Sequence, residues 1–217
     1  MKFFKNLVFI CLIASLFICS GCKKAPIEKI GFGTLENSVY RNDYFNLSIT
    51  LPSDWHALDD EARKDLMSQG KQLITGESKN LKAIVDASEL NSVNLLSVFK
   101  HPLGSPIPYN PSLICVAEKV SHAPGIKRGS DYLYHMKKLI EMGQISYVFS
   151  EDIYSQNIGG ISFDVQDAEV NIGTIKVKQK YFAAIIKGYA LGFVISFTTD
   201  EEEKGFQQIL ADVNFQK

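Results

Sequence analysis

Two cysteines stand three positions apart near the start of the chain, a spacing that permits thiol chemistry. Cys19 and Cys22 frame Ser20 and Gly21. A C-x-x-C pair beside a βαβ pattern is typical of redox-active thiols. Here the pair instead follows an apolar run, residues 6–18, that has two lysines before it. Because a basic start, a short apolar run and small residues form an export signal, we favour processing at this site over a redox role.

The segment resembles the signal of a bacterial lipoprotein. The resemblance implies that signal peptidase II cuts after Gly21 and that Cys22 carries a thioether-linked diacylglycerol. Such signals usually have Leu, Val or Ile three positions before the modified cysteine, where this chain has Cys19. The apolar run is shorter than the roughly 20 residues of a membrane-spanning helix. We therefore expect an exported protein, lipid-anchored to a bacterial membrane; it would face the periplasm in a cell with two membranes, with the outer membrane as one option.

The composition argues against a nucleic-acid partner and against an intramolecular disulfide bond. Without residues 1–21, 21 basic residues face 24 acidic ones, a net charge of −3. Non-specific nucleic-acid binding needs a basic surface, so no nucleic-acid partner is expected. Only Cys115 then keeps a free thiol, so no intramolecular disulfide can form. Cys115 lies in the apolar run 113–117, and we expect its side chain to be buried.

Patterns that could support hydrolysis or metal binding are incomplete. Ser68 and Lys71 match S-x-x-K, in which a lysine helps to deprotonate a serine, but the companion S-D-N and K-T-G elements are missing. The spacings of the histidines fit no zinc motif, although the loops that carry His101 and His122 could converge. The four histidines are His56, His101, His122 and His135.

Carboxylates are grouped in two places where they could act as an acid and a base. Asp164, Asp167 and Glu169 alternate along an expected strand, and we interpret them as a solvated face. Asp59, Asp60 and Glu61 begin an expected helix, where they complement the helix dipole. The run 201–203 opens the final expected helix and complements its dipole in the same way, and Thr199 and Glu202 have the spacing of a capping box. The sequence thus predicts no catalytic residue, no metal site, no cofactor and no enzymatic activity.

The elements that position these residues fall into one expected domain. Residues 1–21 form the signal peptide, 22–38 the lipidated cysteine and a tether, and 39–217 a single domain. Apolar periodicity predicts helices at 59–74, 79–89, 130–142 (capped by Ser130 or Asp131) and 200–213, and strands at 45–51, 95–99, 113–120, 147–149, 161–172, 174–186 and 189–197. Short glycine-containing links between the last strands predict antiparallel hairpins, and thus an α+β fold.

Three segments resemble the Mog1/PsbP-like superfamily. The first, 40–55, ends in Leu-Pro-Ser-Asp-Trp; the second, 106–139, has a Pro-Gly turn and an Asp-Tyr-Leu helix start; the third, 159–215, has Gly-Gly before one long strand and Gln-Lys-Tyr-Phe in the next. The resemblance implies an antiparallel sheet sandwiched by helices, an α/β/α sandwich. Members include photosystem II extrinsic subunits, a Ran-binding nuclear-import factor and exported bacterial lipoproteins. It implies no catalysis and assigns no site residues, and the signal favours the lipoprotein branch.

A proline-rich loop, residues 101–111, is the best candidate for binding a partner. Leu103, Ile107 and Tyr109 are apolar residues that its four prolines hold in a stiffened segment, and a pre-ordered loop loses less entropy on binding. A connector packed on the sheet is the other interpretation, and Trp55 either joins this surface or lies in the core. We expect a non-enzymatic module that binds or assembles with an unknown envelope protein. A small-ligand or metal carrier, with a pocket between helices and sheet, is the alternative, and an envelope hydrolase is a third.

Overall fold

A computed structural model describes residues 30–216, whose strands form two antiparallel sheets. The small sheet has the order β1-β2-β3-β11, with β1 Thr34–Glu36, β2 Val39–Asn42, β3 Leu47–Thr50 and β11 Asn214–Phe215. The large sheet has the order β4-β5-β6-β10-β9-β8-β7, with β4 His56–Ala57, β5 Ser92–Phe99, β6 Ser112–Lys119, β7 Tyr147–Ile158, β8 Ile161–Ile172, β9 Ile175–Ile186 and β10 Tyr189–Phe197. The helices are α1 Asp60–Thr75, α2 Lys79–Glu89, α3 Gly129–Glu141 and α4 Asp200–Ala211.

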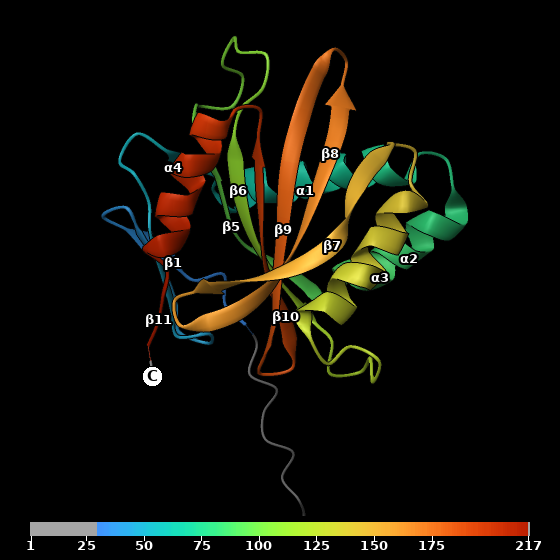
Figure 1. Ribbon diagram of the computed structural model, residues 1–217, viewed down its shortest axis with the longest axis horizontal. Helices are drawn as coiled ribbons and strands as arrows, with labels where there is room; N and C mark the ends of the chain where they lie inside the picture. The colour runs from blue at the N-terminus through green and yellow to red at the C-terminus, as the bar shows by residue number, and fades with distance from the viewer. Residues whose placement is uncertain (1–29, 217) are drawn as a thin grey trace, which may run out of the picture.

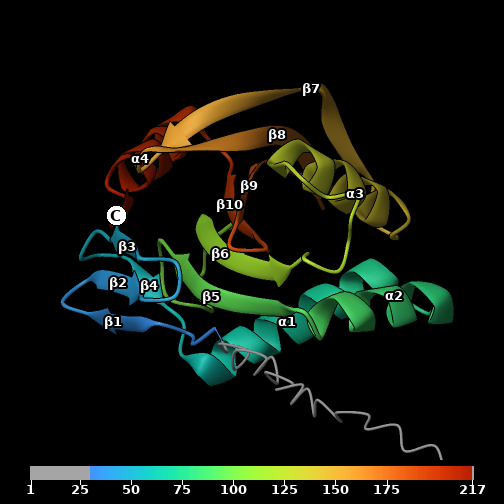
Figure 2. The same cartoon turned by 90° about the horizontal axis from the view of Figure 1, so that it is seen from below.

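The large sheet separates two layers (Figures 1 and 2). Helix α4 and the small sheet pack on one face, whereas α3 packs on β7, β8 and β9 from the other face and α2 contacts β5. Side chains alternate across the strands, so Phe182 and Phe193 face each other on the α4 side while Ala183 lies under α3. This arrangement confirms the predicted α+β fold with an antiparallel sheet between helices.

The hairpins follow the predicted glycine links. Strands β9 and β10 are joined by Lys187 and Gly188, both with positive φ, as a two-residue hairpin turn requires. Strand β7 extends beyond the predicted strand at 147–149. Its additional part lies at the exposed edge of the sheet and carries Glu151 and Asp152, and for this reason the sequence did not indicate it. Charged edge strands resist pairing with other chains, but they lack the apolar alternation by which a strand is recognised.

Part of the expected tether is packed on the domain. Strand β1 pairs with β2, and the preceding residues are held by side chains that follow them in sequence. The Tyr40 hydroxyl donates to the carbonyl oxygen of Phe32 (2.9 Å), and the Asn42 side-chain amide donates to that of Gly31 (2.9 Å). The folded body therefore includes residues 30–38, which corrects a tether ending at Ser38. The composition of residues 30–38 could not reveal this packing, because it depends on two individual buried side chains, those of Tyr40 and Asn42.

Helix α3 begins earlier than predicted, and Asp131 acts from inside its first turn. The cap is Arg128, and the Asp131 carboxylate accepts from the backbone N–H groups of Lys127 and Arg128 at 3.0 Å each. Hydrogen bonds from these two N–H groups lower the pKa of Asp131. A carboxyl with a lowered folded-state pKa adds stability that is complete above its unfolded pKa, about 3.9, and is lost as pH falls through the folded value.

Replacing Asp131 by asparagine should therefore lower the melting temperature at neutral pH and flatten its decline below about pH 4. The check is a series of thermal melts across this range, with Asp152→Asn on the exposed edge of β7 as the control. An equally steep acid decline in wild type and Asp131→Asn would contradict the assignment.

Candidate functional site

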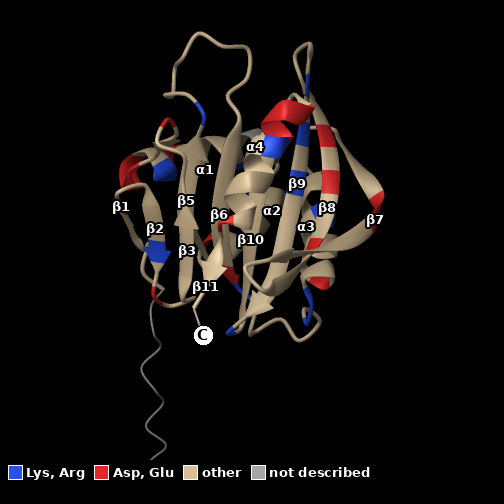
Figure 3. Cartoon of the chain, turned by 60° about the vertical axis from the view of Figure 1, so that its left-hand side comes forward, with Lys and Arg blue, Asp and Glu red and all other residues tan. Residues whose placement is uncertain are grey.

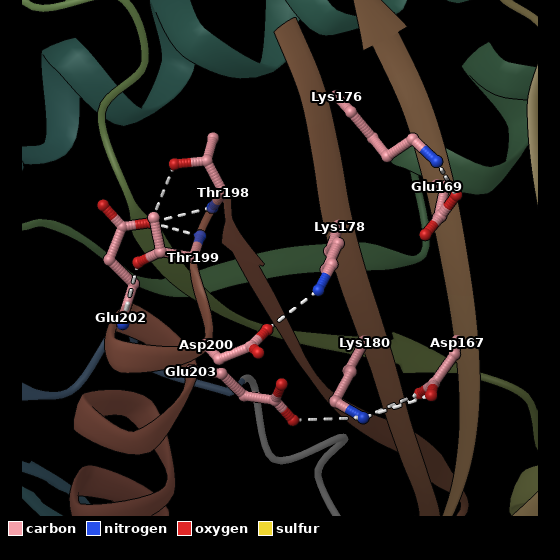
Figure 4. Close-up of polar contacts among 10 residues, drawn as sticks. All are labelled: Asp167, Glu169, Lys176, Lys178, Lys180, Thr198, Thr199, Asp200, Glu202 and Glu203. Atoms are coloured by element: carbon pink, nitrogen blue, oxygen red, sulfur yellow. Dashed lines mark hydrogen bonds and ion pairs between the residues drawn. The ribbon is translucent and has the colours of Figure 1, made fainter.

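The start of α4 is fixed by reciprocal hydrogen bonds. The Thr199 hydroxyl accepts from the backbone N–H of Glu202 at 3.2 Å, and the Glu202 carboxylate accepts from the N–H groups of Thr198 (2.7 Å) and Thr199 (3.1 Å) (Figure 4). This confirms the predicted capping box, which satisfies N–H groups that every helix start leaves unpaired. The box sets the position of α4 beside the end of β10.

Ion pairs then attach the first turn of α4 to strands β8 and β9. Lys178 contacts Asp200 at 2.9 Å, and Lys180 contacts both Glu203 (3.2 Å) and Asp167 (3.1 Å) (Figure 4). Figure 3 shows the acidic first turn of α4 beside the lysine positions of β9. Asp167, expected on a solvated face, is partly exposed and forms an ion pair with Lys180.

The Lys180 ammonium is the most enclosed member of this network. Its side chain is 15% exposed. Burial acts to lower the pKa of Lys180, but hydrogen bonds to Tyr154 and Asp167 outweigh it, so the pKa is raised and the charge is retained. Losing this charge would leave two partly exposed carboxylates without their partner.

Lys180→Met should destabilise the fold by about 1–2 kcal/mol, between the values typical of exposed and buried pairs. Lys176→Met is the matched control, because Lys176 pairs with Glu169 at 2.9 Å at a more exposed position of the same strand. Urea unfolding measures both. Equal losses for the two variants would show that enclosure does not strengthen the Lys180 pairs.

A hollow of about 310 Å³ lies between α4 and the segment that follows β3. Trp55 lines it and packs edge-to-face on Phe206, with ring centroids 5.1 Å apart. Asp54, Glu201 and Asp212 line it as well. These three carboxylates are exposed and form no ion pair with any other residue of 30–216.

A second hollow of about 250 Å³ adjoins the first, and the two share Pro111 and Glu202. Ile107 and Tyr109 of the proline-rich loop line the second hollow. We call the two adjoining hollows the α4 groove. The structure thus places two of the three predicted interaction residues beside α4, while Leu103 of the same loop is 52% exposed.

The loop that borders the α4 groove is closed at its base by a pair of hydrogen bonds. The Asn110 side chain clamps its base by donating to the carbonyl oxygen of His101 (2.7 Å) and accepting from its N–H (3.0 Å). Tyr109 is half-buried; burial raises the pKa of its hydroxyl, although a hydrogen bond with Ser196 opposes the rise. The loop therefore has features of both a connector packed on the sheet, because Tyr109 is half-buried, and a partner-binding loop, because Leu103 is exposed. Trp55 likewise packs against the core while lining the groove.

Sequence reasoning missed Asp54, Asp212 and Gly205 as members of this site. Asp54 follows β3, Asp212 ends α4, and no local pattern indicates that they share a hollow. A signal was present in Gly205, because a glycine inside a helix costs about 1 kcal/mol relative to alanine and calls for a reason.

The S-x-x-K pair lies elsewhere, in a hollow of about 330 Å³ beside α1. Lys71 forms ion pairs with Asp86 and with Glu89, the latter at 2.8 Å. A hydrogen bond to Asp86 is the main reason that the pKa of Lys71 is raised. Because the raised pKa keeps Lys71 protonated, its amine has no free lone pair with which to accept the proton of Ser68, so Lys71 is not suited to activate that serine.

The remaining candidates are not brought together. His101 precedes β6 and His122 follows it, so the strand separates their loops. Cys115 is fully buried, as expected, and burial raises the pKa of its thiol. Gly21 and Cys22 lie outside the described residues.

Within residues 30–216, no group of three or more histidine, cysteine, aspartate or glutamate side chains could hold a metal ion. No helix in the same range is long and apolar enough to span a bilayer.

Comparison with known proteins gives the fold a name. No family model and no curated protein matches the chain. The solution structure of cyanobacterial PsbP (CyanoP) from Synechocystis sp. PCC 6803 superposes with a TM-score of 0.51 at 12% identity, covering 88% of this chain and 100% of that one. The chain has a PsbP-like fold. The crystal structure of LpqN, involved in cell envelope biogenesis of Mycobacterium tuberculosis, gives a TM-score of 0.42 at 13% identity over 79% of this chain and 83% of that one. The fold is the one that the sequence resemblance implied.

Proposed function

We propose that this PsbP-like protein is an exported, lipid-anchored envelope protein that binds a protein partner through the α4 groove. It acts as a non-enzymatic binding or assembly module. The observation that carries the proposal is the groove itself: its hollows are lined by Trp55, Ile107 and Tyr109, and the loop that supplies the last two is clamped at its base and leaves Leu103 exposed. Pre-ordered loops lose little entropy when a partner binds, which suits them to recognition.

The anchor would hold the folded body close to the membrane. Cys22 precedes Ile30, the first described residue, by eight positions. Eight extended residues span at most about 29 Å, so partners on or near the same membrane are within reach.

Labelling cells with radioactive palmitate tests the anchor. Wild type and Cys115→Ala should incorporate label, since Cys115 is buried in the body, whereas Cys22→Ala should not. Label that persists in Cys22→Ala, or an unlabelled wild-type protein that keeps residues 1–21, would refute the anchor.

Shortening the loop tests the binding role. Replacing residues 103–107 by two glycines keeps Tyr109 and the clamp between His101 and Asn110, so the body should stay folded. Crosslinking in native membranes should capture the same partner with wild type and lose it with the shortened loop. A partner captured equally by both proteins would exclude this surface as its binding site.

One observation favours a second candidate, a small-ligand carrier that uses the hollow beside α1. Arg63 lines that hollow and is buried; its guanidinium donates to the carbonyl oxygen of Leu95 (2.8 Å) and pairs with Asp60. Its Nε has no hydrogen-bond partner among residues 30–216. A ligand that binds the native state raises its stability by mass action. Small carboxylates at millimolar concentration should then raise the melting temperature, and no shift would eliminate this candidate.

A further inference from the structure

Gly205 occupies an interior position of α4 that nothing in the described chain requires to be glycine. A Cβ built there meets no atom within 4 Å, whereas a Cβ at Gly192 would meet the carbonyl oxygen of Phe182 at 2.9 Å. Glycine weakens a helix interior relative to alanine, so its presence calls for a reason. Gly205 lines the α4 groove, where a missing side chain lets another chain approach the helix backbone closely.

The charge at the C-terminal end of α4 also destabilises the helix. Asp212 is the C-cap of α4, and the last turn has no basic residue. A carboxylate at a helix C-terminus is repelled by the helix dipole. Asp54 and Glu201 line the same hollow, and Lys100 is its one cationic lining residue. Residues that break a stabilising rule are expected where a site serves a function.

We infer that the α4 groove binds an extended segment of the partner that carries lysine or arginine. This inference rests on the proposed binding function and adds the chemistry of the partner. Cations of the segment would meet Asp54, Glu201 and Asp212, and its backbone would pass over Gly205. An arginine would also stack on Trp55, since guanidinium groups bind indole faces.

Trp55 provides the readout, because it is the one tryptophan of the chain. The mature lipidated protein in detergent is titrated with an octapeptide of alternating glycine and arginine, and with one of alternating glycine and glutamate. The basic peptide should change the tryptophan emission in a saturable way and bind at least tenfold more weakly in about 0.5 M salt, where charges are screened. The acidic peptide should cause no change.

Two pairs of variants separate the groove from general effects. Asp54→Asn, Glu201→Gln and Asp212→Asn together should lower affinity for the basic peptide about tenfold or more, as loss of charge contacts predicts. Neutralising three exposed carboxylates elsewhere (Glu36→Gln, Glu151→Gln and Asp152→Asn) makes the same change in net charge and should leave affinity unchanged.

Glycine variants make the second pair. Gly205→Ala should raise the melting temperature while weakening binding. Gly70→Ala, in α1, has equally open space around its Cβ and should raise the melting temperature alone.

Equal binding of acidic and basic peptides, or equal losses in the two charge variants, would overturn the inference. A partner lost on loop shortening, with no binding of the basic peptide, would leave the binding function standing and refute the basic segment. If the basic peptide binds the groove but loop shortening leaves capture of the partner unchanged, the groove's preference for a basic segment would stand. The proposed binding of the partner at this surface would then be refuted.

Discussion

Phe206→Ala is expected to destabilise the fold by about 3–5 kcal/mol, the range typical of a phenylalanine removed from a core. Phe206 has no exposed surface, and its ring lies 5.1 Å from that of Trp55 and 6.3 Å from that of Phe197. With Ile209 and Leu210, it forms the buried face by which α4 joins the core, and it also supports the groove. Because small domains are stable by only about 5–15 kcal/mol, the loss would be a large share of the total.

Urea unfolding followed by circular dichroism measures this loss. Gln208→Ala on the exposed side of α4 is the control and should change stability little. Trp55 emission in the folded Phe206→Ala protein should also shift, because the ring beneath it is gone. A loss below about 1 kcal/mol would mean that α4 is not held by this contact.

Gly129→Ala is expected to cost about 1–3 kcal/mol or more, because it forces atoms into a packed contact. A Cβ at Gly129 would collide with the carbonyl oxygen of Ala183 and lie 2.7 Å from its carbonyl carbon. Backbone atoms of a central strand cannot move aside as a flexible side chain can. Helix α3 would have to lift from β9, which would also break the hydrogen bond from Ser130 N–H to the Asp164 carboxylate (2.7 Å).

Gly125→Ala is the matched control, since a Cβ at Gly125 meets nothing within 4 Å. Chemical unfolding should separate the two variants, and hydrogen exchange should show faster exchange in α3 of Gly129→Ala alone. Similar stability for both variants would contradict the close approach of α3 to β9.

Elements defined by their own periodicity could be predicted from the sequence. Helix α2 and strand β8 have the bounds that their apolar patterns predicted, and the turn at Lys187 and Gly188 joins β9 to β10 as expected. Elements that depend on distant partners could not. Strand β11 exists because it pairs with β3 from the other end of the chain, and β1 because it pairs with β2.

The candidate site was predictable only in part, for the same reason. Prolines marked the loop 101–111 as stiff, but its position depends on Tyr109 reaching Ser196 on β10. The groove forms only when α4, the segment around Asp54 and that loop meet. The PsbP-like fold explains how these elements come together, but a fold does not fix a function, so the groove has to be tested directly.

Site-specific photo-crosslinking in living cells tests the central claim, that the α4 groove contacts a protein partner in the envelope. A photoreactive amino acid replaces Leu103, the exposed apolar residue of the loop that borders the groove, or, as the control, Ile84 on α2, which is also exposed. One defined protein adduct is expected from position 103 and none from position 84. An adduct from position 84 with none from position 103, or no protein adduct from either, would contradict it.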